Sequence, residues 1–229
     1  MKRLIGAFML CLVFSLIFLA EVLDVFATGN LIKNSGFEED HQYWEVYPGG
    51  GDWGERAKIT IEEVYSGKKS CWTNYGVRQW FKADGGLYYA RFYFKVHPKS
   101  ERARLYFGIE KPDTEEWAYI TVLGVNIYYD QGKVTVEPYR EVEVLEITPV
   151  DRGWYRATFK LRLPEGAYAL ILLSDKKPSP YGHYFDDVYL GVELAPVLPK
   201  FPPSSLLSVL VGVGTVMVLY LFWRKRERR

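Results

Sequence analysis

The chain has 229 residues, of which 29 are Lys or Arg and 28 are Asp or Glu, so its formal net charge at pH 7 is only +1. Such a balanced charge supplies no basic stripe, which argues against a nucleic-acid-binding protein. Of its 2 cysteines, Cys11 lies in the apolar N-terminal segment, so Cys71 has no partner for an intramolecular disulfide in a mature chain.

The first 27 residues predict a secretory signal sequence. Lys2 and Arg3 supply the charged start, an apolar run covers residues 4–20, and Ala27 offers a small residue at the cleavage site. An uncleaved membrane span is the alternative interpretation. Either one places residues 28–194 outside the cell, and that stretch is long enough for one domain with its own core.

Residues 30–194 alternate between apolar and polar side chains with a period of two, and Gly, Pro and Asp clusters break the pattern at short intervals. Many short strands of this kind predict an all-β sandwich without a long helix. The predicted strands are residues 58–64, 86–96, 103–109, 117–122, 125–129, 133–138, 141–147, 154–163, 168–173 and 184–192.

Alternation also predicts which side chains face the core. In the strand at 86–96 the even positions should be buried, namely Tyr88, Ala90, Phe92, Phe94 and Val96. In the strand at 103–109 the odd positions should be buried, namely Ala103, Leu105, Phe107 and Ile109. The other positions leave one sheet with an outer face rich in Tyr, Arg and Lys.

The C-terminal part predicts a membrane anchor. Residues 195–203 form a Pro-rich spacer, residues 204–223 carry no charge, and residues 224–229 are mostly basic. A helix over 204–223 would be about 30 Å long, which spans a bilayer, and the basic tail should stay in the cytoplasm. The prediction is a single-pass cell-membrane protein with its N-terminal domain outside. A Pro-rich stretch, an apolar span and a basic end also resemble sorting signals cut by sortase-like enzymes, which leaves removal of the tail open.

Five short motifs follow one another along the middle of the chain: residues 30–38 (NLIKNSGFE), 65–70 (YSGKKS), 86–88 (GLY), 153–155 (GWY) and 184–190 (YFDDVYL). In this order and spacing they resemble carbohydrate-binding modules of the CenC type, families 4, 9, 16 and 22. The resemblance covers residues 30–194. It implies a galactose-binding-like jelly-roll β-sandwich that binds polysaccharide or envelope glycan without catalysis. Such modules are usually attached to glycoside hydrolases, so a hydrolase or a transporter is a possible neighbour.

The resemblance also implies a structural Ca²⁺ site. Glu38 and Asp186 would bind the ion through their side-chain carboxylates. Backbone carbonyl oxygens of Gly36 and of either Ser66 or Lys68 would complete the site. Alternation supports the site independently of the resemblance, because Asp186 should share the inward face of Val188 and Leu190. An unpaired charge there would be costly, and a hard cation would relieve that cost. A surface carboxylate pair that caps a strand end is the alternative.

Sugar recognition needs flat aromatic rings and hydrogen-bonding groups, and two zones of the sequence supply both. The first is the loop at 43–53, where Trp44 and Trp53 flank a run of three glycines. The second is the polar sheet face, with Trp80, Tyr89, Arg91, Tyr93, Arg104, Tyr106, Trp117 and Tyr119. Its arginines would also suit anionic glycans. Core packing competes with binding for every aromatic residue, and for Trp154 it is the preferred interpretation.

Nothing in the sequence predicts an enzyme. Neighbouring carboxylates such as Asp186 and Asp187 point to opposite faces of a strand and cannot flank one glycosidic bond. The three histidines, His41, His97 and His183, are scattered. Two other interpretations stay open: an envelope structural or interaction protein without sugar binding and, more distantly, a small hydrolase.

Overall fold

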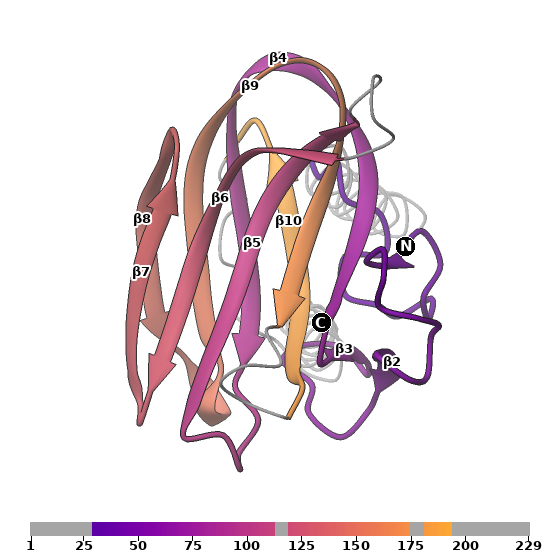
Figure 1. Ribbon diagram of the computed structural model, residues 1–229, viewed down its shortest axis with the longest axis vertical. Helices are drawn as coiled ribbons and strands as arrows, with labels where there is room; N and C mark the ends of the chain where they lie inside the picture. Colours follow the sequence, from indigo (N-terminus) through magenta and orange to yellow (C-terminus); the bar gives the residue numbers. More distant parts are fainter. Residues whose placement is uncertain (1–28, 113–118, 175–180, 194–229) are drawn as a thin grey trace, which may run out of the picture. The chain divides into compact units, whose positions relative to one another are not determined.

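The alternating pattern builds ten β-strands and one short 3-10 turn, Asp151–Gly153, from the part of the chain that the structure describes (Figure 1). The structure is a computed structural model and describes residues 29–112, 119–174 and 181–193. The predicted signal sequence, spacer, membrane helix and basic tail lie outside these residues. Within them, no helix has the length and apolar character needed to cross a membrane.

The all-β prediction is confirmed, and the strands have these bounds in chain order: β1 (Glu45–Val46), β2 (Ala57–Thr60), β3 (Ser70–Thr73), β4 (Gly76–Lys95), β5 (Arg102–Pro112), β6 (Tyr119–Asp130), β7 (Lys133–Tyr139), β8 (Val142–Pro149), β9 (Tyr155–Ser174) and β10 (His183–Gly191). Several boundaries differ from the prediction. The predicted strands at 117–122 and 125–129 are the single strand β6, those at 154–163 and 168–173 are the single strand β9, and β3 and the first half of β4 were not predicted.

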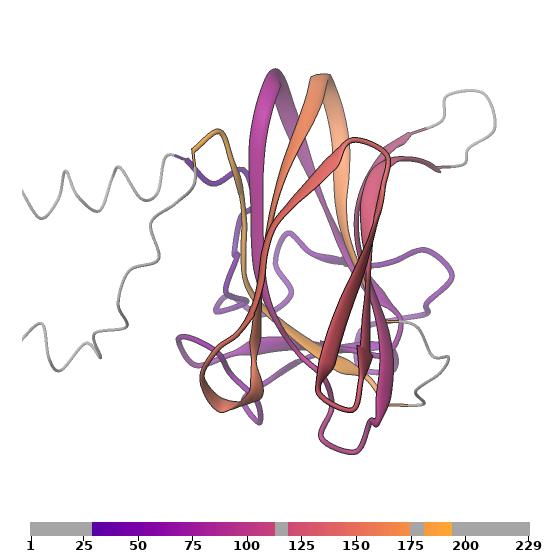
Figure 2. The same ribbon diagram turned by 90° about the vertical axis from the view of Figure 1, so that its left-hand side faces the viewer.

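The two longest strands, β4 and β9, belong to both layers of the sandwich. They pair antiparallel along almost their whole length, from Gly76 opposite Leu173 to Phe94 opposite Tyr155. Layer 1 contains β2, β3, β10, the second half of β4, the first half of β9 and β8. Layer 2 contains β1, the first half of β4, the second half of β9, β5, β6 and β7. Figure 1 shows β4 and β9 arching together from one layer to the other, and Figure 2 shows the layers edge on.

The arch is located at two glycines. Gly85 and Gly86 have φ values of +82° and +125°, which favour glycine. In the β4–β9 ladder Gly86 lies opposite Leu163, and Gly85 therefore falls opposite Pro164. Before the arch the odd positions of β4 are buried, such as Phe81, and after it the even positions are buried, such as Tyr88. The pair therefore changes layers without ending, because positive φ turns the chain while the ladder continues on both sides.

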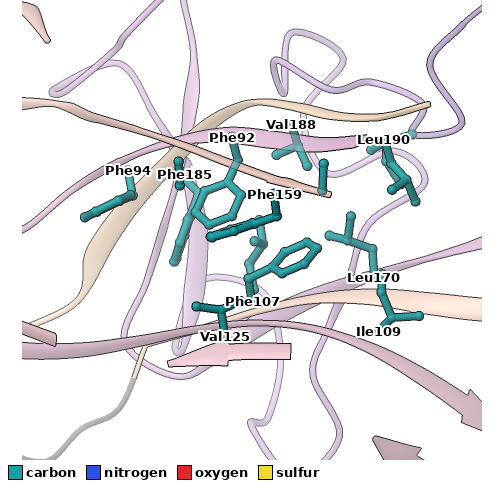
Figure 3. Packing of buried hydrophobic residues seen from close by; sticks show 14 of the residues in the cluster. Phe92, Phe94, Phe107, Ile109, Val125, Phe159, Leu170, Phe185, Val188 and Leu190 are labelled. Atoms are coloured by element: carbon teal, nitrogen blue, oxygen red, sulfur yellow. The ribbon is translucent and has the colours of Figure 1, made fainter. Parts of the chain in front are cut away.

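Phenylalanine rings from both layers fill the core (Figure 3). Phe92 and Phe159 of layer 1 lie 5.6 Å and 5.3 Å, between ring centroids, from Phe107 of layer 2. Each such side chain contributes about 1.5–3 kcal/mol on full burial. The predicted core positions of 86–96 and 103–109 are all buried, which confirms the parity used to assign them.

Candidate functional site

A groove of about 640 Å³ opens on the outer side of layer 2. Strands β5, β6 and β9 supply its floor, the residues beside β1 and β4 supply one wall, and the end of β7 supplies the other. Its lining is mostly aromatic and polar: Tyr47, Tyr75, Arg104, Leu105, Tyr106, Thr121, Asn126, Tyr139, Leu173 and Ser174.

The ring of Tyr106 lies flat on the floor because two glycines leave room for it. Gly108 of β5 pairs with Gly124 of β6. A Cβ atom added to Gly108 would lie 2.5 Å from Cε1 of Tyr106, and one added to Gly124 would collide with the Tyr106 hydroxyl. Burial raises the pKa of Tyr106 to about 12, so its hydroxyl stays protonated. The sheet thus presents one broad, half-buried aromatic surface toward the groove.

Two tyrosines, Tyr47 and Tyr75, form the wall beside β1 and β4. The ring centroids of Tyr47 and Tyr75 are 6.2 Å apart, with 46° between the ring planes. The Tyr75 hydroxyl donates to the carbonyl oxygen of Pro48 at 3.0 Å, and the Tyr47 hydroxyl donates to Oε1 of Glu110 at 2.8 Å. Both rings are therefore held by their hydroxyls, which limits how far the wall can move.

Polar side chains run along the other edge of the Tyr106 ring. Nε and Nη2 of Arg104 donate to Oδ1 of Asn126 at 3.3 Å and 3.0 Å, and the Arg104 guanidinium lies 5.7 Å from the centroid of the Tyr128 ring. These contacts orient the guanidinium beside the floor. Flat rings next to oriented donors are the arrangement that a pyranose ring requires, whereas this lining contains no pair of carboxyl groups for glycoside hydrolysis.

Two of the predicted sugar-binding residues, Arg104 and Tyr106, line the groove. The other lining residues were missed by the sequence analysis, above all Tyr47, Tyr75 and Asn126. Alternation could have placed Asn126 on an outward face, but only the register shows that it lies opposite Tyr106. Tyr47 stands in the loop at 43–53 that was predicted to bind, although the tryptophans of that loop were preferred.

Those tryptophans lie elsewhere. Trp44 is only 3% exposed; it packs against Phe37 with ring centroids 4.9 Å apart, and its Nε1 donates to the carbonyl oxygen of Asn34 at 3.1 Å. The Trp44 ring is therefore not accessible on the surface of this loop, because the loop folds back onto the core. Trp53 is half-buried and lies 5.1 Å from the His41 ring, between centroids.

The second predicted zone is divided between the layers. Tyr89, Arg91 and Tyr93 follow the arch of β4 and lie on layer 1, whereas Trp80 precedes it and lies on layer 2, outside the groove lining. The expectation of one shared face is wrong because β4 crosses between the layers. Tyr119 begins β6, and Trp117 lies outside the described residues.

Tyr93 belongs to a separate packing cluster on the outer side of layer 1. It is 4% exposed and stacks on Tyr65 with ring centroids 3.6 Å apart. Trp154, 1% exposed, and Tyr184 complete the cluster. The packing role predicted for Trp154 is confirmed, and the prediction of Tyr93 as an outward-facing binding residue is wrong because the segment carrying Tyr65 covers it.

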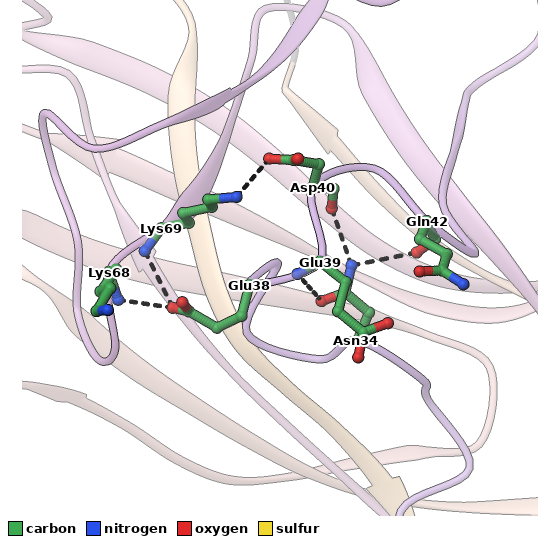
Figure 4. A network of polar contacts seen from close by, with 7 residues as sticks. All are labelled: Asn34, Glu38, Glu39, Asp40, Gln42, Lys68 and Lys69. Carbon is green, nitrogen blue, oxygen red and sulfur yellow. Dashed lines mark hydrogen bonds and ion pairs between the residues drawn. The ribbon is translucent and has the colours of Figure 1, made fainter.

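The five positions of the predicted Ca²⁺ site do come together around the turn at residues 65–69. Oε1 of Glu38 accepts hydrogen bonds from the backbone N–H groups of Lys68 and Lys69 at 2.6 Å and 3.0 Å (Figure 4). Oδ2 of Asp186 accepts from the backbone N–H groups of Tyr65 and Ser66 at 2.9 Å and 3.0 Å. Gly36 lies beside both acidic residues of β10, since a Cβ atom there would be 3.8 Å from Oδ1 of Asp186 and 3.3 Å from Oδ1 of Asp187.

Asp186 is fully buried, but not for the predicted reason. The pairing of β10 with β4 shifts between Asp186 and Tyr189, and Asp187 has a φ of +46°, as in a β-bulge. The bulge places Asp186 opposite Tyr93 on the outer side of layer 1, whereas Val188 and Leu190 enter the core. The predicted shared inward face is therefore wrong, and the turn at 65–69 buries Asp186.

The oxygen atoms of this cluster fit a hard cation in their chemistry. Burial, and secondarily the charge of Asp187, raise the pKa of Asp186 to about 8, although hydrogen bonds from the backbone N–H groups of Ser66, Asp187 and Tyr65 oppose this shift. However, the backbone groups of Ser66 and Lys68 that face the carboxylates are N–H donors. Among residues 29–112, 119–174 and 181–193, no three His, Cys, Asp or Glu side chains form a metal-binding group by themselves. A cation here would need backbone carbonyls to complete its shell.

Comparison with known proteins found similar solved structures. No family model matches the chain, and no curated protein matches it. The xylan-binding CBM22-1 domain of Paenibacillus barcinonensis Xyn10C is 21% identical, with 70% of this chain and 94% of that domain covered and a TM-score of 0.46. A further xylan-binding CBM22 domain is 12% identical, with 74% and 98% covered and a TM-score of 0.47. TmCBM61, solved with β-1,4-galactotriose, is 15% identical, with 72% and 99% covered and a TM-score of 0.36.

These neighbours are all carbohydrate-binding modules, and none is similar enough to assign this chain to their families. Membership of the CenC type stays a prediction.

Proposed function

We propose that the chain is a non-catalytic carbohydrate-binding module that holds a segment of polysaccharide in the groove of layer 2. The observation that carries this proposal is the Tyr106 ring, kept flat by Gly108 and Gly124 and bordered by oriented polar side chains. Glycine weakens a strand unless an aromatic ring packs over it, and here the two glycines give the Tyr106 ring its flat position on the open side of the sheet.

The groove offers two kinds of contact to a sugar. The C–H face of a pyranose ring stacks on Tyr106, and each such aromatic contact contributes about 0.5–1.5 kcal/mol. Hydroxyl groups at the edge of the sugar meet Arg104, Asn126 and Thr121, and each hydrogen bond adds about 1 kcal/mol net. Several sugar units are then needed for useful affinity, which favours a polymer over a monosaccharide.

Affinity electrophoresis of the full-length chain in non-ionic detergent, with soluble xylan or β-1,4-galactan in the gel, tests the proposal, and a glycan array widens the range of sugars. We expect retardation that Tyr106→Ala weakens by about twofold to tenfold in affinity and that Tyr89→Ala preserves, because Tyr89 is a tyrosine of the opposite layer. Failure to bind any glycan would leave an envelope interaction protein as the better interpretation. Release of reducing ends by the purified chain would contradict the non-catalytic assignment.

We further propose that this module is displayed outside the cell on the C-terminal membrane helix. The uncharged run at 204–223 and the basic end at 224–229 support this placement. Protease treatment of intact cells should digest the module while a short C-terminal epitope tag stays protected inside. Mass spectrometry of the mature protein then decides whether the tail is retained or cut. A module recovered intact from the cytoplasmic fraction would refute the placement.

We also propose Ca²⁺ as a structural ligand of Glu38 and Asp186. The burial of Asp186 and the charge of Asp187 beside it support this proposal, and a cation would lock the turn at 65–69 onto β10. Calcium should raise the melting temperature of metal-stripped protein and lose that effect in Glu38→Gln. Equal melting temperatures with EDTA and with calcium would mean that the N–H groups of the turn satisfy these carboxylates alone.

A further inference from the structure

Glu110 of β5 is a buried acidic side chain at the edge of the groove. Its neighbour Ile109 points into the core, so Glu110 is directed to the outer side of layer 2, yet it is only 3% exposed. Carboxylates on the outer side of a sheet are normally hydrated, and burying one costs free energy unless it is paired. A buried carboxylate at this position therefore calls for an explanation other than core packing.

The two oxygens of Glu110 have different surroundings. Oε1 accepts the hydrogen bond from the Tyr47 hydroxyl at 2.8 Å. Oε2 is buried and accepts no hydrogen bond from the residues that the structure describes. The guanidinium of Arg78 on β4 attracts the carboxylate, and Nη2 of Arg78 also forms an ion pair with Oε2 of Glu45 at 2.9 Å.

These contacts converge on the wall of the groove. Glu45 belongs to β1, two residues before Tyr47, so Arg78 and Glu110 hold the same short segment at two points. Beyond Tyr47 the chain enters a glycine run, with φ values of +83° at Gly49 and +82° at Gly51, and this run has few side chains that could anchor the wall. The backbone N–H of Tyr47 donates to the carbonyl oxygen of Gly76 at 2.9 Å and its ring contacts Tyr75, but the end of the ring that carries the hydroxyl is held by Glu110.

We infer that Glu110 is a positioning residue of the groove: it holds the Tyr47 ring in the wall, its ionisation tightens that hold, and affinity for polysaccharide follows its charge. The inference rests on the proposed carbohydrate function. The charged and titratable groups that face Glu110 are Tyr47 beside β1, Arg78 on β4 and Tyr106 on β5.

The physical reason is the strength of the hydrogen bond that Tyr47 donates. An ionised acceptor makes a hydrogen bond roughly twice as strong as a neutral one. Burial raises the pKa of Glu110, although the Tyr47 hydrogen bond and Arg78 lower it in part. Protonation of Glu110 therefore begins at a higher pH than for an ordinary glutamate, and it loosens the Tyr47 ring. Affinity should fall as the pH falls through this titration.

Two variants separate charge from shape. Glu110→Gln keeps an acceptor for Tyr47 but cannot ionise, and Tyr47→Phe keeps the ring but cannot donate. Affinity of the full-length chain for soluble xylan and β-1,4-galactan is measured from about pH 4 to about pH 8. The unchanged chain should lose about threefold to tenfold in affinity at the acid end, and both variants should bind weakly with a flat profile. A pH profile in Glu110→Gln that matches the unchanged chain would overturn the inference.

A ligand-free measurement distinguishes failure of this inference from failure of the proposed function. The chain is labelled with 3-fluorotyrosine, and the ¹⁹F signal of Tyr47 is identified by its loss in Tyr47→Phe. This signal should shift with pH in the unchanged chain and in the control Glu146→Gln, whose carboxylate pairs with Arg156 on layer 1, but not in Glu110→Gln. A Tyr47 signal insensitive to Glu110 overturns the inference even if sugars bind. If the Tyr47 signal shifts with pH through Glu110 but the chain binds neither polysaccharide, the result supports the positioning role and counts against the carbohydrate function.

Discussion

Gly108→Ala should damage the groove without touching the core. The three nearest atoms to a Cβ at this position all belong to Tyr106, at 2.5 Å from Cε1, 2.8 Å from Oη and 2.9 Å from Cζ. Ordinary carbon contacts lie near 3.5–4.0 Å, so the ring must lift by about 1 Å from the floor. Losing most of its stacking, worth about 0.5–1.5 kcal/mol, should weaken polysaccharide binding by about twofold to tenfold.

The same change should lower stability only while the Tyr106 ring is present. Overpacking costs about 1–3 kcal/mol, partly offset by about 0.5–1 kcal/mol from replacing a strand glycine. In the Tyr106→Ala background the methyl group has space, so Gly108→Ala should be neutral or stabilising. Urea unfolding of the unchanged chain, the two single variants and the double variant measures the coupling free energy between positions 106 and 108. Additive free energies together with unchanged affinity in Gly108→Ala would refute the flat-ring interpretation of the groove.

Three further predictions concern the fold. Burial lowers the pKa of His183 to about 4, below its value of about 6.5 in the unfolded chain. As the pH falls from 6.5 to 4 the unfolded chain binds a proton first, so about 3 kcal/mol of stability should be lost. His183→Gln should flatten that part of the stability profile measured by urea unfolding, and an unchanged profile would contradict the shift. Trp44→Ala should cost about 3–5 kcal/mol in the same assay, far more than expected for an exposed binding residue. Gly85→Ala forces a φ of +82° on alanine and places a Cβ 3.2 Å from the Glu165 nitrogen, so it should lower stability by about 1–2 kcal/mol, and a neutral effect would mean that the arch adapts freely.

The alternation rule failed at Asp186 of the predicted Ca²⁺ site. Strict alternation from Leu190 back to Asp186 counts four residues and places both on one face. The β-bulge at Asp187 inserts one extra residue into that count, so the residues before it change sides: Asp186 turns to the outer side and Phe185 enters the core. The local pattern contains no sign of this bulge, because Asp187 tolerates positive φ without needing to be glycine. The five motif positions nevertheless converge, since the turn at 65–69 and β10 meet in space.

Several features were determined by the amino-acid order alone. Alternation in 86–96 and 103–109 predicted the buried rings of Phe92, Phe94 and Phe107, because a strand has a period of two whatever its partners. The all-β class followed from the same pattern, and so did the outward direction of Arg104 and Tyr106. These properties depend on neighbours in the chain, which a single sequence contains in full.

The groove itself was decided only by the tertiary structure. Glycine and proline at 85–86, 124 and 164 predicted strand ends, but the continuous ladders of β4, β6 and β9 carry the chain through them. That continuity sent Tyr89 and Trp80 to opposite layers. The folding of the loop at 43–53 onto the core buried Trp44 and left Tyr47 in the lining of the groove with Tyr75 and Tyr106. The register between β5 and β6 set Gly108 opposite Gly124, which made room for a flat ring. Long-range pairing determines such a surface, since each of its residues becomes a neighbour only after the sheet has formed.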